Sequence, residues 1–142
     1  MCHNYITISG SSRDVQLKVR PSGVASDHNV LSEHKWYRFD GNDGGQMPTT
    51  CARENHCGTQ SPGWLRGSHP LRESGTVKRE VCFRTGANCC VRNLTMYVRQ
   101  CVGFFVYIFP EVPSEIKGRY CVEQVKGEIC KKMLEIRCNN FF

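Results

Sequence analysis

No apolar run in this sequence is long enough to cross a membrane. The longest one, at 102–109 (VGFFVYIF), has eight residues, whereas a membrane-spanning helix needs about 20. The apolar segment of a secretory signal peptide is also missing, because Met1 is followed directly by Cys2 and by polar residues. The sequence therefore predicts no membrane span.

The sequence also lacks the short motifs that organise common catalytic sites. It has no GxSxG turn, no HExxH motif and no phosphate-binding loop with its lysine. Cysteine and histidine are residue types used in nucleophilic catalysis, but none of the cysteines stands in a catalytic signature. His69, within the triplet SHP, is expected to be structural or exposed. We therefore predict a protein that is not an enzyme and has no cofactor.

Basic residues outnumber acidic ones but form no cluster. Nineteen Lys and Arg residues against thirteen Asp and Glu residues give a net charge of +6, which favours acidic glycans or anionic surfaces as partners. Nucleic-acid binding requires a concentrated basic patch. The scatter of basic residues along the chain predicts no nucleic-acid partner.

Cysteine is the residue type in which the chain is rich. It has ten cysteines, six of them within residues 51–101. An even number at irregular spacing indicates a disulfide framework and an oxidising compartment. The adjacent residues Cys89 and Cys90 do not easily bond to each other, so each is expected to bond a separate cysteine. A disulfide framework without a signal peptide favours a fragment of a longer secreted chain over an incomplete gene model.

Two metal sites are alternatives to this interpretation. Structural zinc sites draw paired ligands from CxxC-like knuckles, and the chain has no CxxC. Asp40 precedes the turn-forming residues 41–45 (GNDGG) and Asp43 lies within them, but this segment lacks the alternating oxygen ligands and distal glutamate of a calcium-binding loop. We expect disulfides and a plain turn, and no bound metal.

Alternating apolar and polar residues predict a mainly β fold. The expected strands lie at 15–19, 35–39, 75–83, 91–101 and 102–109. A short helical turn is expected at 47–53, and a tight loop at 58–70, which holds three glycines and two prolines. Residues 122–137 have apolar positions near helical spacing, which predicts a helical tail or the start of a following module. The predicted fold class is a small disulfide-rich domain with antiparallel sheets and one or two helical turns.

One glycosylation motif and several aromatic residues are candidates for function at the surface. Asn93 begins the only N-x-S/T sequon with a permitted middle residue (NLT), which fits a secreted glycoprotein. The larger aromatic residues are expected mainly in the core, with a sugar-binding platform as the alternative. They are Trp36, Tyr37, Trp64, Phe104, Phe105 and Tyr107.

Six motifs follow one another between residues 36 and 121. They are WYRFDGNDGGQMPTTC at 36–51, CGTQSPGWLRGSHP at 57–70, GTVKREVC at 75–82, CC at 89–90, VRQCVGFFVY at 98–107 and YC at 120–121. This succession resembles the eight-cysteine module of the uromodulin and zymogen-granule membrane glycoprotein family, which also occurs in extracellular proteins with von Willebrand D and EGF-like domains. With the opening CHNY at 2–5, the resemblance covers residues 2–121.

The resemblance implies a disulfide pattern that spacing alone leaves open. Ser26 and Ile116 stand where family members usually have two cysteines that bond each other, so their loss leaves no orphan thiol. The implied pairs are Cys2–Cys101, Cys51–Cys89, Cys57–Cys121 and Cys82–Cys90. Cys130 and Cys138 then bond each other or cysteines outside this chain. In the family, the glycan that bacterial adhesins bind lies in the segment matching 108–113 (IFPEVP), which has no sequon here, so a decoy role is not expected from that segment.

The resemblance implies a module at 2–121, with 122–142 as a tail or the start of a following module. Its expected function is non-catalytic interaction or adhesion within a secreted or cell-surface glycoprotein. Display or binding of glycans is the alternative. The expected partners are an extracellular protein or glycan, and EGF-like, von Willebrand D or zona pellucida type domains are expected to flank it in the full-length protein. Exposed loops at 40–46 and 63–74 are expected to carry binding specificity.

Overall fold

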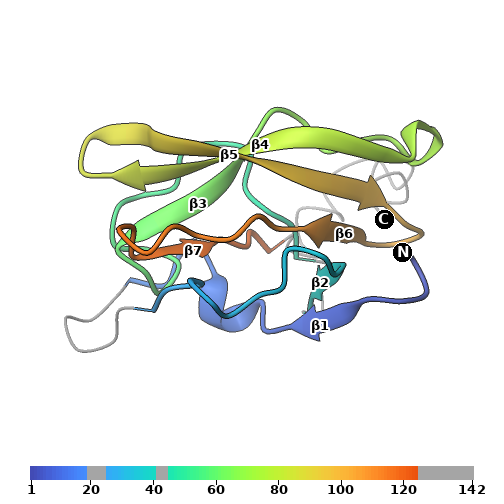
Figure 1. The fold of residues 1–142 in the computed structure, drawn as a ribbon, viewed down its shortest axis with the longest axis horizontal. Coiled ribbons are helices and arrows are strands. Elements are labelled where there is room, and N and C mark those ends of the chain that lie inside the picture. The colour runs from blue at the N-terminus through green and yellow to red at the C-terminus, as the bar shows by residue number, and fades with distance from the viewer. Residues whose placement is uncertain (19–24, 41–44, 125–142) are drawn as a thin grey trace, which may run out of the picture.

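In the computed structural model, which describes residues 1–18, 25–40 and 45–124, one mixed sheet of seven strands forms the body of the protein (Figure 1). The spatial order of the strands is β1-β2-β6-β5-β4-β3-β7. Two short 3-10 helices, η1 (Ser11–Arg13) and η2 (Arg72–Ser74), lie in the connections. The strands are β1 (Ile6–Ile8), β2 (Tyr37–Phe39), β3 (Ser61–Arg66), β4 (Thr76–Thr85), β5 (Asn88–Gln100), β6 (Phe105–Ile108) and β7 (Gly118–Tyr120).

The long antiparallel hairpin of β4 and β5 dominates one layer of the molecule (Figure 1). Its residues alternate, so that Val81 and Phe83 face the core while Lys78 and Glu80 are exposed. The turn between the strands contains Gly86 at φ 59°, a conformation that glycine adopts without steric cost. The strands predicted at 75–83 and 91–101 are therefore present, and the structure shows that they pair as one hairpin.

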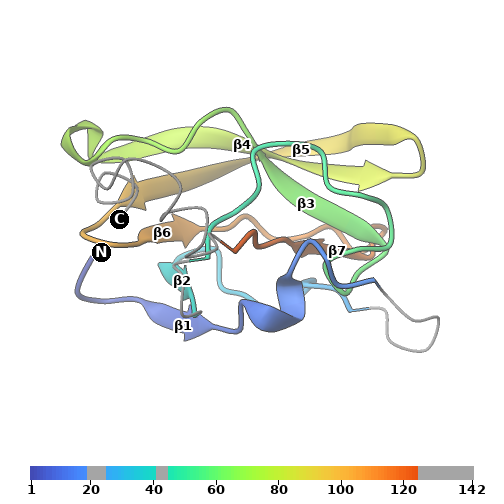
Figure 2. The ribbon, with the colours of Figure 1, turned by 180° about the vertical axis from the view of Figure 1, so that it is seen from behind.

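The sheet curls so strongly that its two edges come into the same layer (Figures 1 and 2). The segments that follow β1 and β7 are joined by a parallel bridge between Asp14 and Val122. The apolar side chains enclosed by this curl form one core, centred on stacked rings of Tyr107, Phe109 and Tyr120. β6 lies between β2 and β5 and is buried on both faces, as its continuous apolar residues predicted.

The mainly β class is confirmed, and most neighbouring strands pair antiparallel as expected, but two pairs at the edges of the sheet are parallel. β1 pairs with β2 in parallel, and β3 pairs with β7 in parallel. Each of these pairs joins strands that are far apart in the chain, as parallel pairing requires. The outer strands β1 and β7 have three residues each, too few for an alternating pattern to reveal them.

The tight loop predicted at 58–70 is wrong, because β3 (Ser61–Arg66) occupies its middle. Gly63 does not mark a turn here. A Cβ at Gly63 would lie 2.8 Å from the ring of Phe83, so the glycine allows the Phe83 side chain to pack directly on the β3 backbone. Pro62 lies opposite Arg119 in the parallel pair with β7. Gly63 and Pro62 therefore lie within a strand, at positions where the sequence predicted turns.

Two further local predictions fail. Residues 15–18 form turns and an isolated bridge, because the Asp14 carboxylate accepts a hydrogen bond from Gln16 N–H and curls the chain; Val19 lies outside the described residues. Residues 47–53 form no helical turn, since the Pro48 carbonyl accepts a hydrogen bond from Leu65 N–H of β3.

No helix in the described part of the chain is long and apolar enough to span a membrane. Most of the turn at 41–45 and of the tail at 122–142 lies outside the described residues.

Candidate functional site

Four disulfides tie the sheet together, and they join the same cysteines that the resemblance implied. Their sulfurs connect segments separated by 8 to 99 residues. The pairs are Cys2–Cys101, Cys51–Cys89, Cys57–Cys121 and Cys82–Cys90. Cys130 and Cys138 lie outside the described residues, so their pairing stays a prediction.

The adjacent cysteines Cys89 and Cys90 lie at the start of β5 and bond different segments. Cys90 bonds Cys82 across the β4–β5 hairpin, and its N–H donates to the Asn88 side chain. Cys89 bonds Cys51, and its carbonyl accepts a hydrogen bond of 2.8 Å from Trp64 Nε1. Neighbouring residues of a strand point to opposite faces, so the doublet links the hairpin to two different places.

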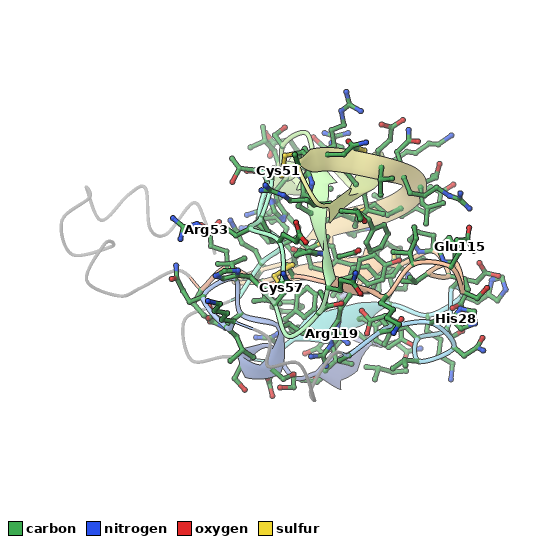
Figure 3. The ribbon with its side chains drawn as sticks, turned by 90° about the vertical axis from the view of Figure 1, so that its left-hand side faces the viewer. His28, Cys51, Arg53, Cys57, Glu115 and Arg119 are labelled. Atoms are coloured by element: carbon green, nitrogen blue, oxygen red, sulfur yellow. A yellow bond between two sulfur atoms is a disulfide. The ribbon has the colours of Figure 1, made fainter. Side chains whose placement is uncertain are left out.

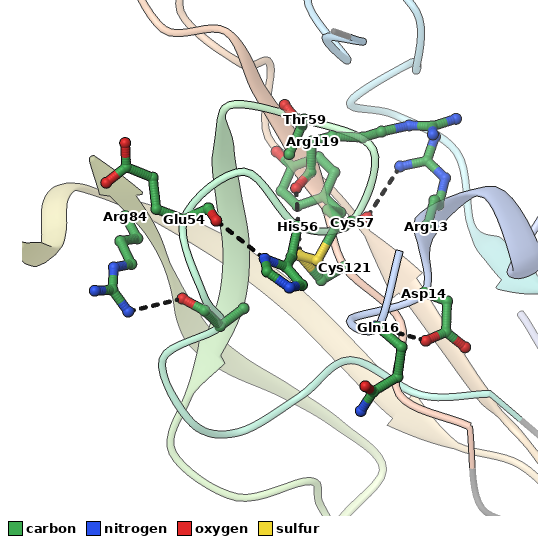
Figure 4. The surroundings of a disulfide bond; sticks show 12 residues. Arg13, Asp14, Gln16, Glu54, His56, Cys57, Thr59, Arg84, Arg119 and Cys121 are labelled. Atoms are coloured by element: carbon green, nitrogen blue, oxygen red, sulfur yellow. Dashed lines mark hydrogen bonds between the residues drawn. A yellow bond between two sulfur atoms is a disulfide. The ribbon is translucent and has the colours of Figure 1, made fainter. Parts of the chain in front are cut away.

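The Cys57–Cys121 disulfide is buried in a small cluster beside the main core (Figures 3 and 4). Both cysteines are fully inaccessible to solvent, and Ala52 and Val15 pack against them. Cys57 itself has φ 62°, a left-handed conformation that is uncommon for a residue with a side chain. This bridge holds the 51–60 segment against the end of β7.

A buried ion pair lies near this disulfide, and sequence reasoning did not find it. Arg13 Nη1 and Nη2 donate to the two carboxylate oxygens of Asp27 at 2.6 and 2.8 Å, and both side chains are at most 3 % exposed. Tyr120 N–H also donates to Asp27, and Arg119 Nε lies 3.7 Å from it. Burial and the neighbouring Arg13 charge lower the pKa of Arg119, and the Asp27 charge opposes this. Nothing in the spacing of these residues signals the contact.

His69 is largely buried, and its ring stacks on Phe105 with centroids 4.3 Å apart. Its Nε2 lies 2.9 Å from Tyr107 Oη, which also accepts a hydrogen bond from Met47 N–H. Burial, and secondly the charge of Arg79, lowers the pKa of His69 from 6.5 to about 4. Burial raises the pKa of Tyr107 far above its usual value. Both groups are neutral at pH 7 and hold the loop after β3 against the core.

The lowered pKa of His69 predicts that the free energy of unfolding decreases in mild acid. Its pKa is lower in the folded state than in the unfolded chain, so the unfolded state binds the extra proton. The contribution is fully present above about pH 6.5 and is lost as the pH falls toward 4, by about 3 kcal/mol. We expect His69→Gln to flatten the pH dependence of the unfolding free energy in that window, measured by urea unfolding at pH 4 to 7. His34→Gln, at an exposed histidine, is the control. An unchanged slope in the His69 variant would contradict this prediction.

The remaining histidines and carboxylates do not converge on a metal. Among residues 1–18, 25–40 and 45–124, no group of three or more His, Cys, Asp or Glu residues could hold an ion. His28 Nδ1 lies 2.7 Å from the carbonyl of Val112, and His56 Nδ1 lies 3.0 Å from that of Glu54 (Figure 4). Asp40 accepts a hydrogen bond from Gly10 N–H, while Asp43 lies outside the described residues.

Asn93 is exposed near the middle of β5. It lies opposite Cys82 in the hairpin, and Thr95, the third residue of the sequon, is exposed on the same face. The motif is therefore presented on an open sheet surface. Modification of Asn93 stays a prediction.

An open groove lies at the end of β5, beside the Cys2–Cys101 disulfide. Its walls include the apolar side chains of Leu71 and Val102, which are 63 and 72 % exposed, and the guanidinium groups of Arg72 and Arg99. Glu73, His3 and the aromatic rings of Tyr5 and Phe104 complete it, together with Cys2, Gln100 and Cys101. Arg38 stacks on Phe104 at 3.9 Å, which fixes that ring. The groove combines apolar, aromatic and cationic surface.

The aromatic residues singled out in the sequence are either buried or half-buried, and of them Phe104 lines the groove. Tyr37, Phe105 and Tyr107 are buried as expected. Trp36, Trp64 and Phe104 are half-buried. Of the exposed large apolar residues in the described ranges, Tyr97 is the one aromatic member, so these ranges hold no broad aromatic platform.

Comparison with known proteins agrees with the cysteine pattern. Residues 37–122 match the family model of the uromodulin-like domain. The chain is 33 % identical over 141 residues to the pancreatic secretory granule membrane major glycoprotein GP2 of Rattus norvegicus, covering 96 % of this chain and 25 % of that protein. It is 40 % identical over 103 residues to uromodulin of the same organism, covering 72 % of this chain and 15 % of that protein. The chain thus spans a quarter or less of the length of these relatives.

Proposed function

The chain belongs to the uromodulin-like domain family, and from this premise we propose that it is a non-catalytic interaction module of an extracellular glycoprotein. The relative GP2 is named as a secretory granule membrane glycoprotein. The four described disulfides support an extracellular location, since such bridges persist in oxidising surroundings.

The observation that carries the non-catalytic proposal is where the perturbed ionisable groups lie. Catalytic sites place groups with shifted pKa values in a cleft that substrate can enter. Here the pKa values of His69, Tyr107, Arg119 and Tyr120 are shifted mainly by burial. These four residues are bonded within the fold, and none of them lines the groove beside Cys2–Cys101. Their arrangement supports packing and not chemistry.

We place the interaction surface at the groove. Its apolar walls are exposed, and its Arg72 and Arg99 side chains favour a partner that presents acidic groups beside apolar ones. Arg99 contacts the Met1 sulfur at 3.5 Å and Arg72 has no carboxylate within ion-pair distance among the described residues. An extracellular protein segment of that composition fits the groove better than an uncharged glycan.

A binding screen with matched surface variants tests this proposal. The secreted protein is offered to a panel of extracellular protein domains and to a glycan array. The double variant Leu71→Asp/Val102→Asp is expected to lower the affinity for a protein binder at least about 10-fold, as loss of a central apolar contact does. Val30→Asp, at an exposed residue outside the groove, is the control. Binders that tolerate the groove variant as well as the control would overturn the placement.

The second candidate function is display of a glycan at Asn93. Its support is the exposure of Asn93 and Thr95 on one face of β5. We expect protein secreted from mammalian cells to lose mass on treatment with peptide N-glycosidase F, and Asn93→Gln to abolish that loss. If wild-type protein carries no glycan, this candidate fails. If lectins bind only the wild-type protein, while protein binders bind both the wild type and Asn93→Gln, glycan display is a separate function of the module.

The domain organisation is also part of the proposal. We propose a module at 2–121 and a tail or following module at 122–142, with EGF-like, von Willebrand D or zona pellucida type domains beside it in a longer chain. The small share of each relative that the chain covers supports this mosaic arrangement.

A further inference from the structure

We propose that the Cys51–Cys89 disulfide is a thiol-exchange site, at which an external thiolate attacks Cys89 Sγ and displaces Cys51 as the leaving thiolate. Among residues 1–18, 25–40 and 45–124, the other three bridges have no comparable arrangement. The proposal rests on the access to this bridge and on a cation held beside one of its two sulfurs. It does not depend on the identity of any binding partner.

The Arg84 guanidinium is fixed beside Cys51. Its Nη1 lies 3.6 Å from Cys51 Sγ and also donates to the Ala52 carbonyl at 3.2 Å. Its Nε donates to the Gly86 carbonyl at 2.9 Å. Two backbone bonds therefore hold a positive charge next to the sulfur, and no carboxylate within ion-pair distance of Arg84 appears among the described residues.

Access distinguishes this bridge from the others. Cys51 and Cys89 are both partly exposed. Each of the remaining pairs has at least one inaccessible end: Cys57 and Cys121 are fully buried, Cys82 is fully buried and Cys101 is 3 % exposed. Exchange needs a thiolate to approach along the S–S axis. Cys51–Cys89 is the one described bridge in which both cysteine residues are partly exposed.

The direction of the reaction follows from the charge. A thiolate attacks one sulfur and the other sulfur leaves as a thiolate, and the better-stabilised thiolate leaves faster. Arg84 stabilises negative charge on Cys51, so attack occurs at Cys89. The attacking dithiol forms a mixed disulfide with Cys89, and its second thiolate then releases Cys89. The dithiol ends as a disulfide, and Cys51 and Cys89 end as thiols.

Opening this bridge changes the surface without dismantling the sheet. Cys82–Cys90 still closes the hairpin, and Cys57–Cys121 still holds the 51–60 segment. The Trp64 indole, which donates to the Cys89 carbonyl, loses a fixed partner. Tryptophan fluorescence therefore reports the exchange.

Timed reduction tests the proposal on the intact secreted protein. The protein is treated with dithiothreitol at pH 7 without denaturant, samples are quenched with N-ethylmaleimide, and labelled cysteines are identified by peptide mapping. We expect Cys51 and Cys89 to be labelled first, together with a change in tryptophan emission. If another bridge opens first, or if all four open together, the proposal is wrong.

Arg84 variants separate the electrostatic role from a structural one. With the charge removed in Arg84→Gln, we expect initial labelling of Cys51 to be about 3- to 10-fold slower, and Arg84→Lys is expected to recover part of the rate. A residue that merely braces the loop would have the opposite effect, since its loss would speed reduction. Arg92→Gln, at a nearby exposed arginine of β5, is the control. An unchanged or faster rate in Arg84→Gln would overturn the assignment.

Discussion

Replacing Asp27 with alanine is expected to lower the free energy of unfolding by about 3–5 kcal/mol. Asp27 accepts hydrogen bonds from Arg13 and from Tyr120 N–H, and its carboxylate is 1 % exposed. Its loss leaves the Arg13 guanidinium charged and unpaired inside the protein. Arg13 Nη1 keeps a hydrogen bond of 3.2 Å to the Tyr120 carbonyl, but this neutral group does not balance the charge.

The comparison that isolates this effect uses two other variants, measured by urea unfolding at pH 7. Glu115→Ala removes an exposed ion pair with Arg92 and is expected to cost less than about 1 kcal/mol. The double replacement Arg13→Met/Asp27→Leu removes both charges and is expected to be less destabilising than Asp27→Ala alone. If Asp27→Ala costs no more than Glu115→Ala, the buried pair is not important for stability.

Removal of the buried disulfide is expected to have an effect of similar size. Cys57 and Cys121 are separated by 64 residues, and the loop-entropy relation gives about 4 kcal/mol for a loop of that length. Because both sulfurs are buried, the double variant Cys57→Ala/Cys121→Ala also leaves unfilled space, which adds to the loss. We expect the urea midpoint of this variant to fall sharply, as followed by tryptophan fluorescence without reductant.

The matched control for that experiment is the shortest bridge. Cys82 and Cys90 are separated by only 8 residues, for which the same relation gives about 2.5 kcal/mol. The hairpin that they join is also held by the β4–β5 ladder. We expect Cys82→Ala/Cys90→Ala to be the more stable of the two double variants. The reverse order would show that loop length does not control the stability of this framework.

The central strands could be predicted because the apolar pattern within each strand shows which of its faces are buried. β4 alternates at Val77, Arg79 and Val81, and β6 is apolar on both faces; both patterns follow directly from burial. β3 was hidden because Gly63 and Pro62 normally interrupt strands, and only the Phe83 ring, twenty residues further along the chain, explains the glycine. In β3, packing against a distant residue outweighs the local preference of glycine and proline for turns, and this packing cannot be predicted from the local sequence.

The candidate site was predictable only in part. The ten cysteines indicated a disulfide framework, but eight cysteines alone can be paired in 105 ways. The family resemblance supplied the four pairs that the structure contains. Asn93 carries a local motif and was found. The Arg13–Asp27 pair and the groove beside Cys2–Cys101 bring together segments that are remote in sequence. No periodicity or spacing within a single segment encodes such contacts.

The four described bridges close loops of very different length, from 8 to 99 residues, and this difference favours an order of oxidation during synthesis. Cys82 and Cys90 meet as soon as the β4–β5 hairpin forms, and hairpins form in about 1–10 μs. Of the eight cysteines in these bridges, Cys2 is made before the others, and its partner Cys101 is 99 residues away, so five other cysteines of the set emerge before that partner. At about 5–20 residues per second this interval lasts about 5–20 s. During that time Cys2 can pair with the wrong cysteine, so correct folding of the module requires either that Cys2 stays reduced or that wrong pairs exchange.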